Sequence, residues 1–158
     1  MPKFYTARYL RENKDNVDWR NISKDQVLSE KIIRECADKV DWTYISIVQT
    51  LSEDFIREFS DKVSWDYISK YQKLSENFIR EFSDKVSWNG ISTNQTLSED
   101  FIREFSNKVN WVYISYSQKL SANFILEFID KIDWFYLLVN KNISEEIKKH
   151  KTKKEFIL

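Results

Sequence analysis

The chain has 158 residues, 42% of them hydrophobic, which suits one folded domain and excludes a disordered segment. Its 25 basic and 25 acidic residues balance, so it lacks the strong positive charge of a dedicated nucleic-acid or anionic-membrane binder. The single cysteine, Cys36, excludes an intramolecular disulfide, and the longest apolar run, at 134–139, is too short to cross a bilayer. A soluble, cytoplasmic chain is therefore expected.

Tryptophan recurs every 23 residues, and no insertion breaks this register. A fixed period is the mark of a repeat architecture. Counted from each tryptophan, the majority pattern is W-x-Y-I-S-x-x-Q-x-L-S-E-x-F-I-R-E-F-S-D-K-V-(S/D). The six tryptophans are Trp19, Trp42, Trp65, Trp88, Trp111 and Trp134.

Residues 1–18 are expected to form a helical half repeat, because they match the second half of the pattern. Five full repeats follow at 19–133. Residues 134–158 form a capping repeat and tail, in which Lys148 and Lys151 replace core residues and supply a polar outer face. The expected organisation is a single repeat domain over 1–158.

Each repeat is expected to contain two helices, since apolar residues recur at helical spacing and N-cap residues occur twice per repeat. In the repeat that opens at Trp65, the pattern predicts a short first helix at 65–72 and a longer second helix at 76–85. The expected caps are Asp18, Ser29, Asp41, Ser52, Ser64, Ser75, Ser87, Ser98, Asn110, Ser121, Asp133 and Ser144.

The predicted fold class is all-α, an α-solenoid of stacked two-helix repeats with a helical half repeat at the N-terminus and a polar capping helix at the C-terminus. One glycine and one proline in the whole chain favour helices throughout. One repeat alone buries too little apolar surface to fold, so neighbouring repeats must share their apolar faces.

Charged residues four apart are expected to pair along the second helices and to form a solvated face. The Glu/Arg set is Glu30/Arg34, Glu53/Arg57, Glu76/Arg80 and Glu99/Arg103, and a Glu/Lys set runs from Glu35/Lys39 to Glu127/Lys131. Catalysis by carboxylates requires two acidic residues in different environments, whereas these acidic residues recur at equivalent positions of the repeats. No enzymatic activity and no catalytic residues are therefore predicted.

No cofactor or metal site is predicted either. His150 is the only histidine and lies far along the chain from Cys36, which takes the place of a core phenylalanine and is expected to be a buried, inert thiol. A phosphate-binding loop cannot be drawn with Gly90 as the only glycine.

The recurring tryptophans could serve as stacking platforms for bases or sugars, and the recurring glutamines could read bases. Core packing is the better interpretation of the tryptophans, and hydrogen bonding to turn carbonyls that of the glutamines. The basic run at 148–154 could touch RNA, phospholipid or an acidic protein, or could simply be a favourable cationic helix end. The glutamines are Gln26, Gln49, Gln72, Gln95 and Gln118.

Positions that vary between repeats are the better indicators of binding, because structure does not dictate them. The second and sixth positions, four apart on the first helix, share one face, and this face turns apolar in the last two repeats. The candidate protein-binding residues are Val112, Tyr116, Phe135, Val139, Ile47 and Lys70. Alternatively, the C-terminal residues 156–158 fold back and cover part of this region.

The strings LSEDFIREFSDKVSW and WDYISKYQKLSENFIREF resemble short tandem repeats in proteins of giant DNA viruses that infect amoebae, the mimivirus and megavirus relatives. The resemblance covers about residues 17–147. It implies a viral protein made in the host cytoplasm, of a class regarded as interaction scaffolds, and it carries over no catalytic or ligand residue.

Three functions follow as hypotheses. The first is a non-enzymatic scaffold that binds a protein partner, such as a host factor. The second is a self-assembling structural element in which the apolar patch of one chain meets another chain. The third is weak nucleic-acid binding through the glutamines and the basic tail, which predicts a steep dependence of affinity on salt.

Overall fold

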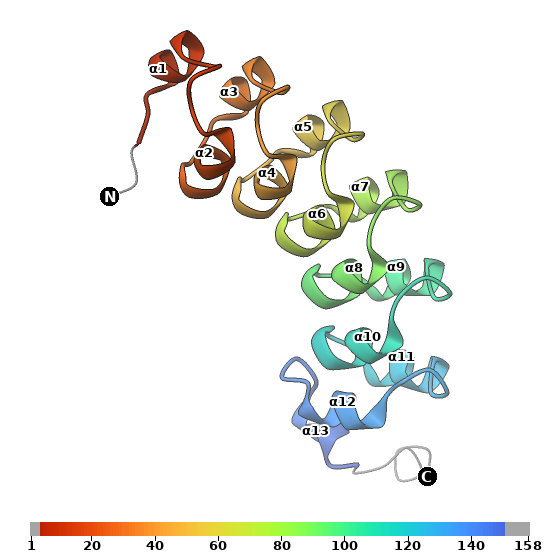
Figure 1. Cartoon of the computed structure of the whole chain (residues 1–158). Coiled ribbons are helices and arrows are strands. Elements are labelled where there is room, and N and C mark those ends of the chain that lie inside the picture. The colour runs from red at the N-terminus through yellow and green to blue at the C-terminus, as the bar shows by residue number, and fades with distance from the viewer. Residues whose placement is uncertain (1–3, 151–158) are drawn as a thin grey trace. The chain divides into compact units, whose positions relative to one another are not determined.

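The computed structural model describes residues 4–150, and these residues form thirteen α-helices and no strand (Figure 1). The helices occur in pairs at the 23-residue period seen in the sequence. The prediction of an all-α solenoid of two-helix repeats is confirmed.

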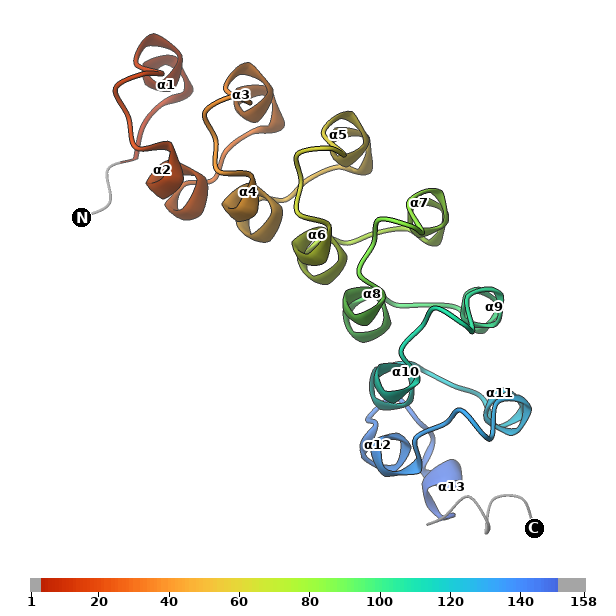
Figure 2. The same ribbon diagram turned by 45° about the vertical axis from the view of Figure 1, so that its right-hand side comes forward.

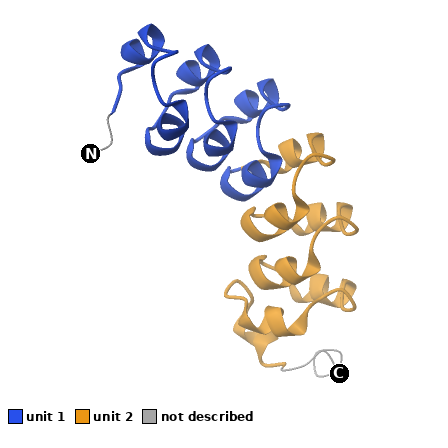
Figure 3. Ribbon diagram, viewed as in Figure 1, with its two compact units in different colours: residues 1–73 blue, residues 74–158 orange. Residues whose placement is uncertain are grey.

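The chain divides into two compact units, unit 1 (Met1–Lys73) and unit 2 (Leu74–Leu158), shown in blue and orange in Figure 3. Unit 1 contains α1 (Ala7–Glu12), α2 (Trp19–Asp25), α3 (Glu30–Glu35), α4 (Trp42–Val48), α5 (Glu53–Glu58) and α6 (Trp65–Tyr71). Unit 2 contains α7 (Glu76–Glu81), α8 (Trp88–Asn94), α9 (Glu99–Glu104), α10 (Trp111–Ser117), α11 (Ala122–Glu127), α12 (Trp134–Val139) and α13 (Glu145–Lys148). The single domain over 1–158 stays a prediction.

Within each unit, the first helices of the repeats lie side by side in one row and the second helices in another (Figures 1 and 2). In unit 1, α4 packs against α2 and α6; in unit 2, α10 packs against α8 and α12. The core lies between the rows. It is built from apolar positions that recur along the repeats, such as those of Phe55 and Ile56 on α5, both 0% exposed, and Ile45 on α4.

The second helices are shorter than predicted. In the repeat that opens at Trp65, the expected helix at 76–85 ends at Glu81, because Phe82 leaves the helical region at φ −110° and ψ 29°. The carbonyl of Phe82 then accepts from the amides of Lys85 (2.9 Å) and Val86 (3.0 Å), which closes a turn. A side-chain hydrogen bond from the next tryptophan, Trp88 Nε1 to the carbonyl of Ser83, further holds this turn.

All twelve predicted N-cap residues stand at helix starts, but the two cap positions of a repeat differ in backbone geometry. The caps of the second helices have ψ between 148° and 159°, and each serine there accepts an amide bond. The caps of the first helices have ψ between 90° and 107°. There, Asp18, Asp41, Asn110 and Asp133 accept the bond, whereas Ser64 and Ser87 make no capping bond.

The substitution Ser64→Asn should therefore stabilise the protein. At the equivalent cap, the Asn110 side chain accepts from the amides of Val112 and Tyr113, and the introduced asparagine would reach the first turn of α6 in the same way. We expect the free energy of unfolding to rise by about 0.5–1 kcal/mol in urea denaturation. The matched control is Ser52→Asn, where the serine already caps α5 and no gain is expected. Equal effects of the two substitutions would contradict the explanation.

Candidate functional site

Four of the six predicted binding residues lie on two adjacent helices of unit 2. Val112 and Tyr116 belong to α10, Phe135 and Val139 belong to α12, and these two helices pack against each other. Their exposed fractions are 38%, 50%, 71% and 52%, respectively. Four apolar or aromatic side chains are thus exposed on neighbouring helices of one unit.

The other two predicted residues lie in unit 1. Ile47 on α4 is half-buried, and Lys70 on α6 is exposed. The Lys70 ammonium lies 5.1 Å from the ring centroid of Tyr71, a cation–π contact within the same helix. Ile47 and Lys70 therefore belong to unit 1, whereas the other four predicted residues belong to unit 2.

Sequence reasoning missed two tyrosines of the same surface, Tyr113 and Tyr136, each 37% exposed. They stand at the third position of their repeats, where tyrosine recurs. A residue that recurs along the repeats is expected to serve the fold, so the pattern gives no sign of a binding role. Helical spacing could have found them, because Tyr113 lies three residues before Tyr116 and Tyr136 lies three residues before Val139. We call Val112, Tyr113, Tyr116, Phe135, Tyr136 and Val139 together the aromatic face.

The rings of the aromatic face are arranged edge to face. Tyr116 and Tyr136 have ring centroids 6.0 Å apart with an interplanar angle of 88°, and Phe135 and Tyr136 lie 5.3 Å apart at 85°. Such T-shaped pairs are a favourable aromatic geometry. A pocket of about 310 Å³ is lined by Asn110, Val112, Tyr113, Tyr116 and Tyr136.

Buried hydrogen bonds hold the two helices of the face together. The amide of Asp133 donates to Ser115 Oγ at 3.0 Å, and Asn140 Nδ2 donates to the carbonyls of Ser115 and Gln118, both at 2.8 Å. Beneath the face, Ile114 on α10 and Leu137 on α12 are 0% exposed. The residues of the aromatic face therefore lie on two helices that are held together, and not on a loop.

The glutamines hydrogen-bond between repeats, as predicted. Gln49 is 3% exposed, and its Nε2 donates to the carbonyls of Ser23 (3.1 Å) and Gln26 (2.9 Å). Its Oε1 accepts from the amide of Leu28 at 2.8 Å. Gln118 repeats these three bonds in unit 2. Four of the five glutamines are buried and engaged, so they cannot read bases. Gln26 is half-buried and bonds to the backbone of Tyr5.

The tryptophans pack against neighbouring residues and are not open platforms. Trp42 Nε1 donates to the carbonyl of Ala37 at 3.0 Å, and its ring lies 4.9 Å from that of Phe59. Lys62 of the same repeat lies 5.9 Å from the centroid of the Trp42 ring. In unit 2, Lys131 is similarly placed 5.4 Å from that of Trp111. The tryptophans thus pack against neighbouring side chains, but only Trp19, 6% exposed, belongs to the buried core, and the other five are half-buried.

The predicted Glu/Arg pairs within helices form at 3.5–3.8 Å, but shorter ion pairs join neighbouring repeats. Arg34 Nε lies 2.6 Å from Glu58 in unit 1, and Arg103 Nε lies 2.8 Å from Glu127 in unit 2. The Arg103 guanidinium also lies 5.0 Å from the Phe124 ring centroid. This surface is thus occupied by contacts between repeats.

The predicted Glu35/Lys39 pair is wrong. Glu35 is the last residue of α3, so Lys39 does not follow it on the same helix. Glu35 instead accepts from Arg11 at 2.6 Å, and Lys39 binds Asp15 at 2.7 Å. The hydrogen bond from Arg11 holds the pKa of the Glu35 carboxyl below its usual value. Glu104 and Lys108 likewise do not pair with each other: Glu104 binds Arg80, and Lys108 binds Asp84.

The residues considered for catalysis or metal binding do not come together. Cys36 is 0% exposed, and burial raises the pKa of its thiol, which makes it a poor nucleophile. Among residues 4–150, no group of three or more His, Cys, Asp and Glu side chains could hold a metal ion. The basic run lies mostly outside the described residues, as do residues 156–158.

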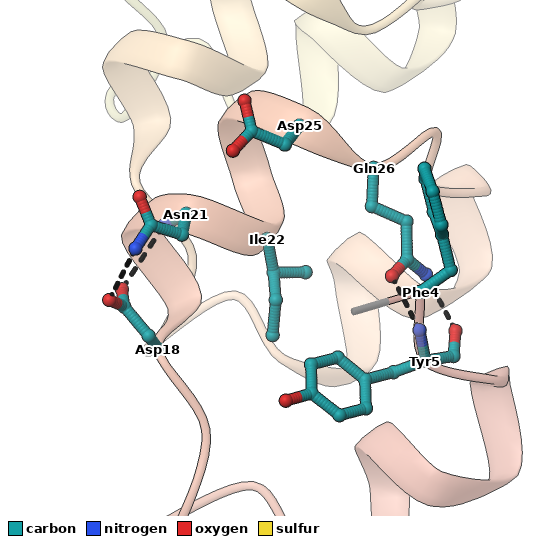
Figure 4. A pocket seen from close by; sticks show the side chains of 7 residues that line it. All are labelled: Phe4, Tyr5, Asp18, Asn21, Ile22, Asp25 and Gln26. Atoms are coloured by element: carbon teal, nitrogen blue, oxygen red, sulfur yellow. Dashed lines mark hydrogen bonds between the residues drawn. The ribbon is translucent and has the colours of Figure 1, made fainter. Parts of the chain in front are cut away.

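A second pocket, of about 290 Å³, lies on unit 1 beside α2 (Figure 4). Three of its polar lining residues already make hydrogen bonds within the fold. Asp18 accepts from the amide and the side chain of Asn21, at 3.1 and 2.7 Å, and Gln26 bonds to both backbone groups of Tyr5. The remaining lining residues are Phe4, Ile22 and Asp25. We assign this pocket to the fold rather than to binding.

The fold and the surface together define a helical-repeat protein of the α-solenoid class that carries an exposed aromatic face. Comparisons with protein-family models, with curated proteins and with solved structures found no match. In the described part of the chain, no helix has the length and apolar character needed to cross a membrane.

Proposed function

We propose that the protein is a non-enzymatic scaffold that binds another protein through the aromatic face. The observation that carries the proposal is the contrast between adjacent helices of unit 2. On α8, the positions equivalent to Val112, Tyr113 and Tyr116 are Asn89, Gly90 and Thr93. The repeat thus does not require apolar or aromatic residues at these positions. Clustered exposed apolar residues without a structural role are typical of an interaction site.

The composition of the face supports this proposal. Tyrosine and phenylalanine are enriched at protein interfaces, because their rings provide large contact area with few rotatable bonds. The hydrogen bonds that hold α10 and α12 together reduce the entropy lost on binding. The resemblance to tandem repeats of amoeba-infecting giant viruses supports a further proposal, that this is a viral protein whose partner is a host protein of the cytoplasm.

A capture experiment tests the proposed function. The native chain and a variant with serine at Val112, Tyr116, Phe135 and Val139 are immobilised and exposed to amoebal lysate. We expect the native chain to retain a protein that the four-serine variant recovers at least tenfold less. A loss of about 1.4 kcal/mol of apolar contact energy lowers the affinity tenfold. Circular dichroism must show that both chains are folded.

The matched control is a variant with serine at Val48 and Tyr71, which are 48% and 49% exposed on unit 1. It should retain the partner like the native chain. Equal recovery by the native chain and the four-serine variant would refute the aromatic face as the site. If sedimentation shows that the mass of the native chain alone rises with concentration, and that of the four-serine variant does not, the partner is a second copy of this chain.

A further inference from the structure

The pocket on the aromatic face has a neutral lining. Asn110, Val112, Tyr113, Tyr116 and Tyr136 surround it, and none of them is a Lys, Arg, His, Asp or Glu residue. Burying a charged ligand group there would cost free energy, because no opposite charge lines the pocket. The complementary ligand surface is therefore uncharged and largely apolar.

The polar groups that the pocket offers are tyrosine hydroxyls. Within residues 4–150, the hydroxyls of Tyr113, Tyr116 and Tyr136 make no hydrogen bond. The Asn110 side chain, in contrast, is already engaged: its Oδ1 accepts from the amides of Val112 (3.1 Å) and Tyr113 (3.4 Å), and its Nδ2 donates to Asn89 at 2.8 Å. The residues that line the pocket thus include three tyrosines whose hydroxyls can donate, and a matching ligand supplies acceptors.

Among the conformations in which proteins bind peptides, one fits these features best. An added β-strand needs the edge of a sheet, and residues 4–150 contain no strand. A helix uses its backbone carbonyls internally, so it would cover the three hydroxyls without giving them acceptors. A polyproline II segment has no internal hydrogen bonds, leaves its carbonyls free to accept, and carries uncharged apolar rings that pack on aromatic side chains.

The ring geometry agrees with such a ligand. The edge-to-face pairs Tyr116–Tyr136 and Phe135–Tyr136 hold adjacent rings nearly perpendicular, at 88° and 85°. Because Tyr116 and Phe135 are 50% and 71% exposed, they offer aromatic rings against which proline rings can stack. Resting on the proposed function, the geometry points to a proline-rich segment in the polyproline II conformation as the ligand of the aromatic face.

Nuclear magnetic resonance titration of the full chain tests this inference. The probe is decaproline with blocked ends, and a blocked glycine–serine peptide of the same length is the control ligand. We expect decaproline to shift signals of α10 and α12, and the control peptide to leave them unchanged. Tyr116→Phe removes one hydroxyl and keeps the ring, so it should weaken decaproline binding about fivefold, the effect of one hydrogen bond.

Tyr71→Phe is the matched control variant, because Tyr71 is a tyrosine of similar exposure, 49%, on unit 1. It should bind decaproline with native affinity. Absence of shifts, shifts confined to other helices, or native affinity in Tyr116→Phe would overturn the inference. Binding seen only in a chain shortened to residues 1–150 would overturn it for the intact protein. If the titration fails and the capture experiment succeeds, the proposed scaffold function is supported and only the proline-rich ligand is refuted.

Discussion

Replacing Gln49 by methionine should lower the free energy of unfolding by about 3 kcal/mol. Methionine preserves the length and volume of the side chain, so the substitution removes hydrogen bonds and creates no large cavity. It leaves the amide of Leu28 and the carbonyls of Ser23 and Gln26 without the partner that each has in unit 1. An unsatisfied buried polar group costs about 1–3 kcal/mol.

Urea denaturation followed by tryptophan fluorescence measures this loss, and Gln26→Met is the matched control. Gln26 is only half-buried and makes two bonds, both to Tyr5. Water can replace these bonds more easily, so we expect a loss of about 1 kcal/mol. If the two substitutions cost the same, the glutamine bonds between repeats do not stabilise the protein in the way their burial indicates.

Replacing Phe101 by alanine should lower the free energy of unfolding by about 4 kcal/mol. Phe101 is 0% exposed on α9. Its ring lies 4.8 Å from that of Phe105 and 6.3 Å from that of Trp88, and the Arg80 guanidinium is 5.0 Å from its centroid. Truncation leaves a cavity at the junction of these groups, which the surrounding repeats can fill only in part.

The same truncation at Phe135 separates stability from binding. Phe135 is 71% exposed on α12, so Phe135→Ala should change the free energy of unfolding by less than about 0.5 kcal/mol. Both variants are measured by urea denaturation, and both are tested for capture of the partner. Phe135→Ala should lose partner while keeping stability. A stability loss at Phe135 equal to that at Phe101 would mean that its ring is not at the free surface.

Stacking explains why these effects are large for such short helices. The helices of the described residues have four to seven residues, too few to be stable alone in water. Their stability comes from the shared core and from bonds between repeats, such as Asn110 N to Ser92 Oγ at 2.9 Å and Arg103 to Glu127. Loss of one such contact is therefore felt by two repeats.

The sequence by itself determined the repeat period, the helical class, the positions of the helix starts and the inward-facing residues. Each of these depends on signals a few residues apart. Ser98 accepts from the amide of Phe101, three residues on, and Phe101 and Ile102 fall on the buried face through helical spacing. The sequence also showed that the second and sixth positions of the repeat change from polar to apolar residues in the last two repeats.

Only the tertiary structure decided which partners these residues take. Glu35 binds Arg11, 24 residues before it, rather than Lys39, because the chain leaves the helix at Cys36. Tyr113 recurs like a core residue, yet it is 37% exposed, and it joins the aromatic face because α10 packs against α12. Partners across repeats depend on how the repeats stack, and this geometry is not encoded in any short stretch of sequence.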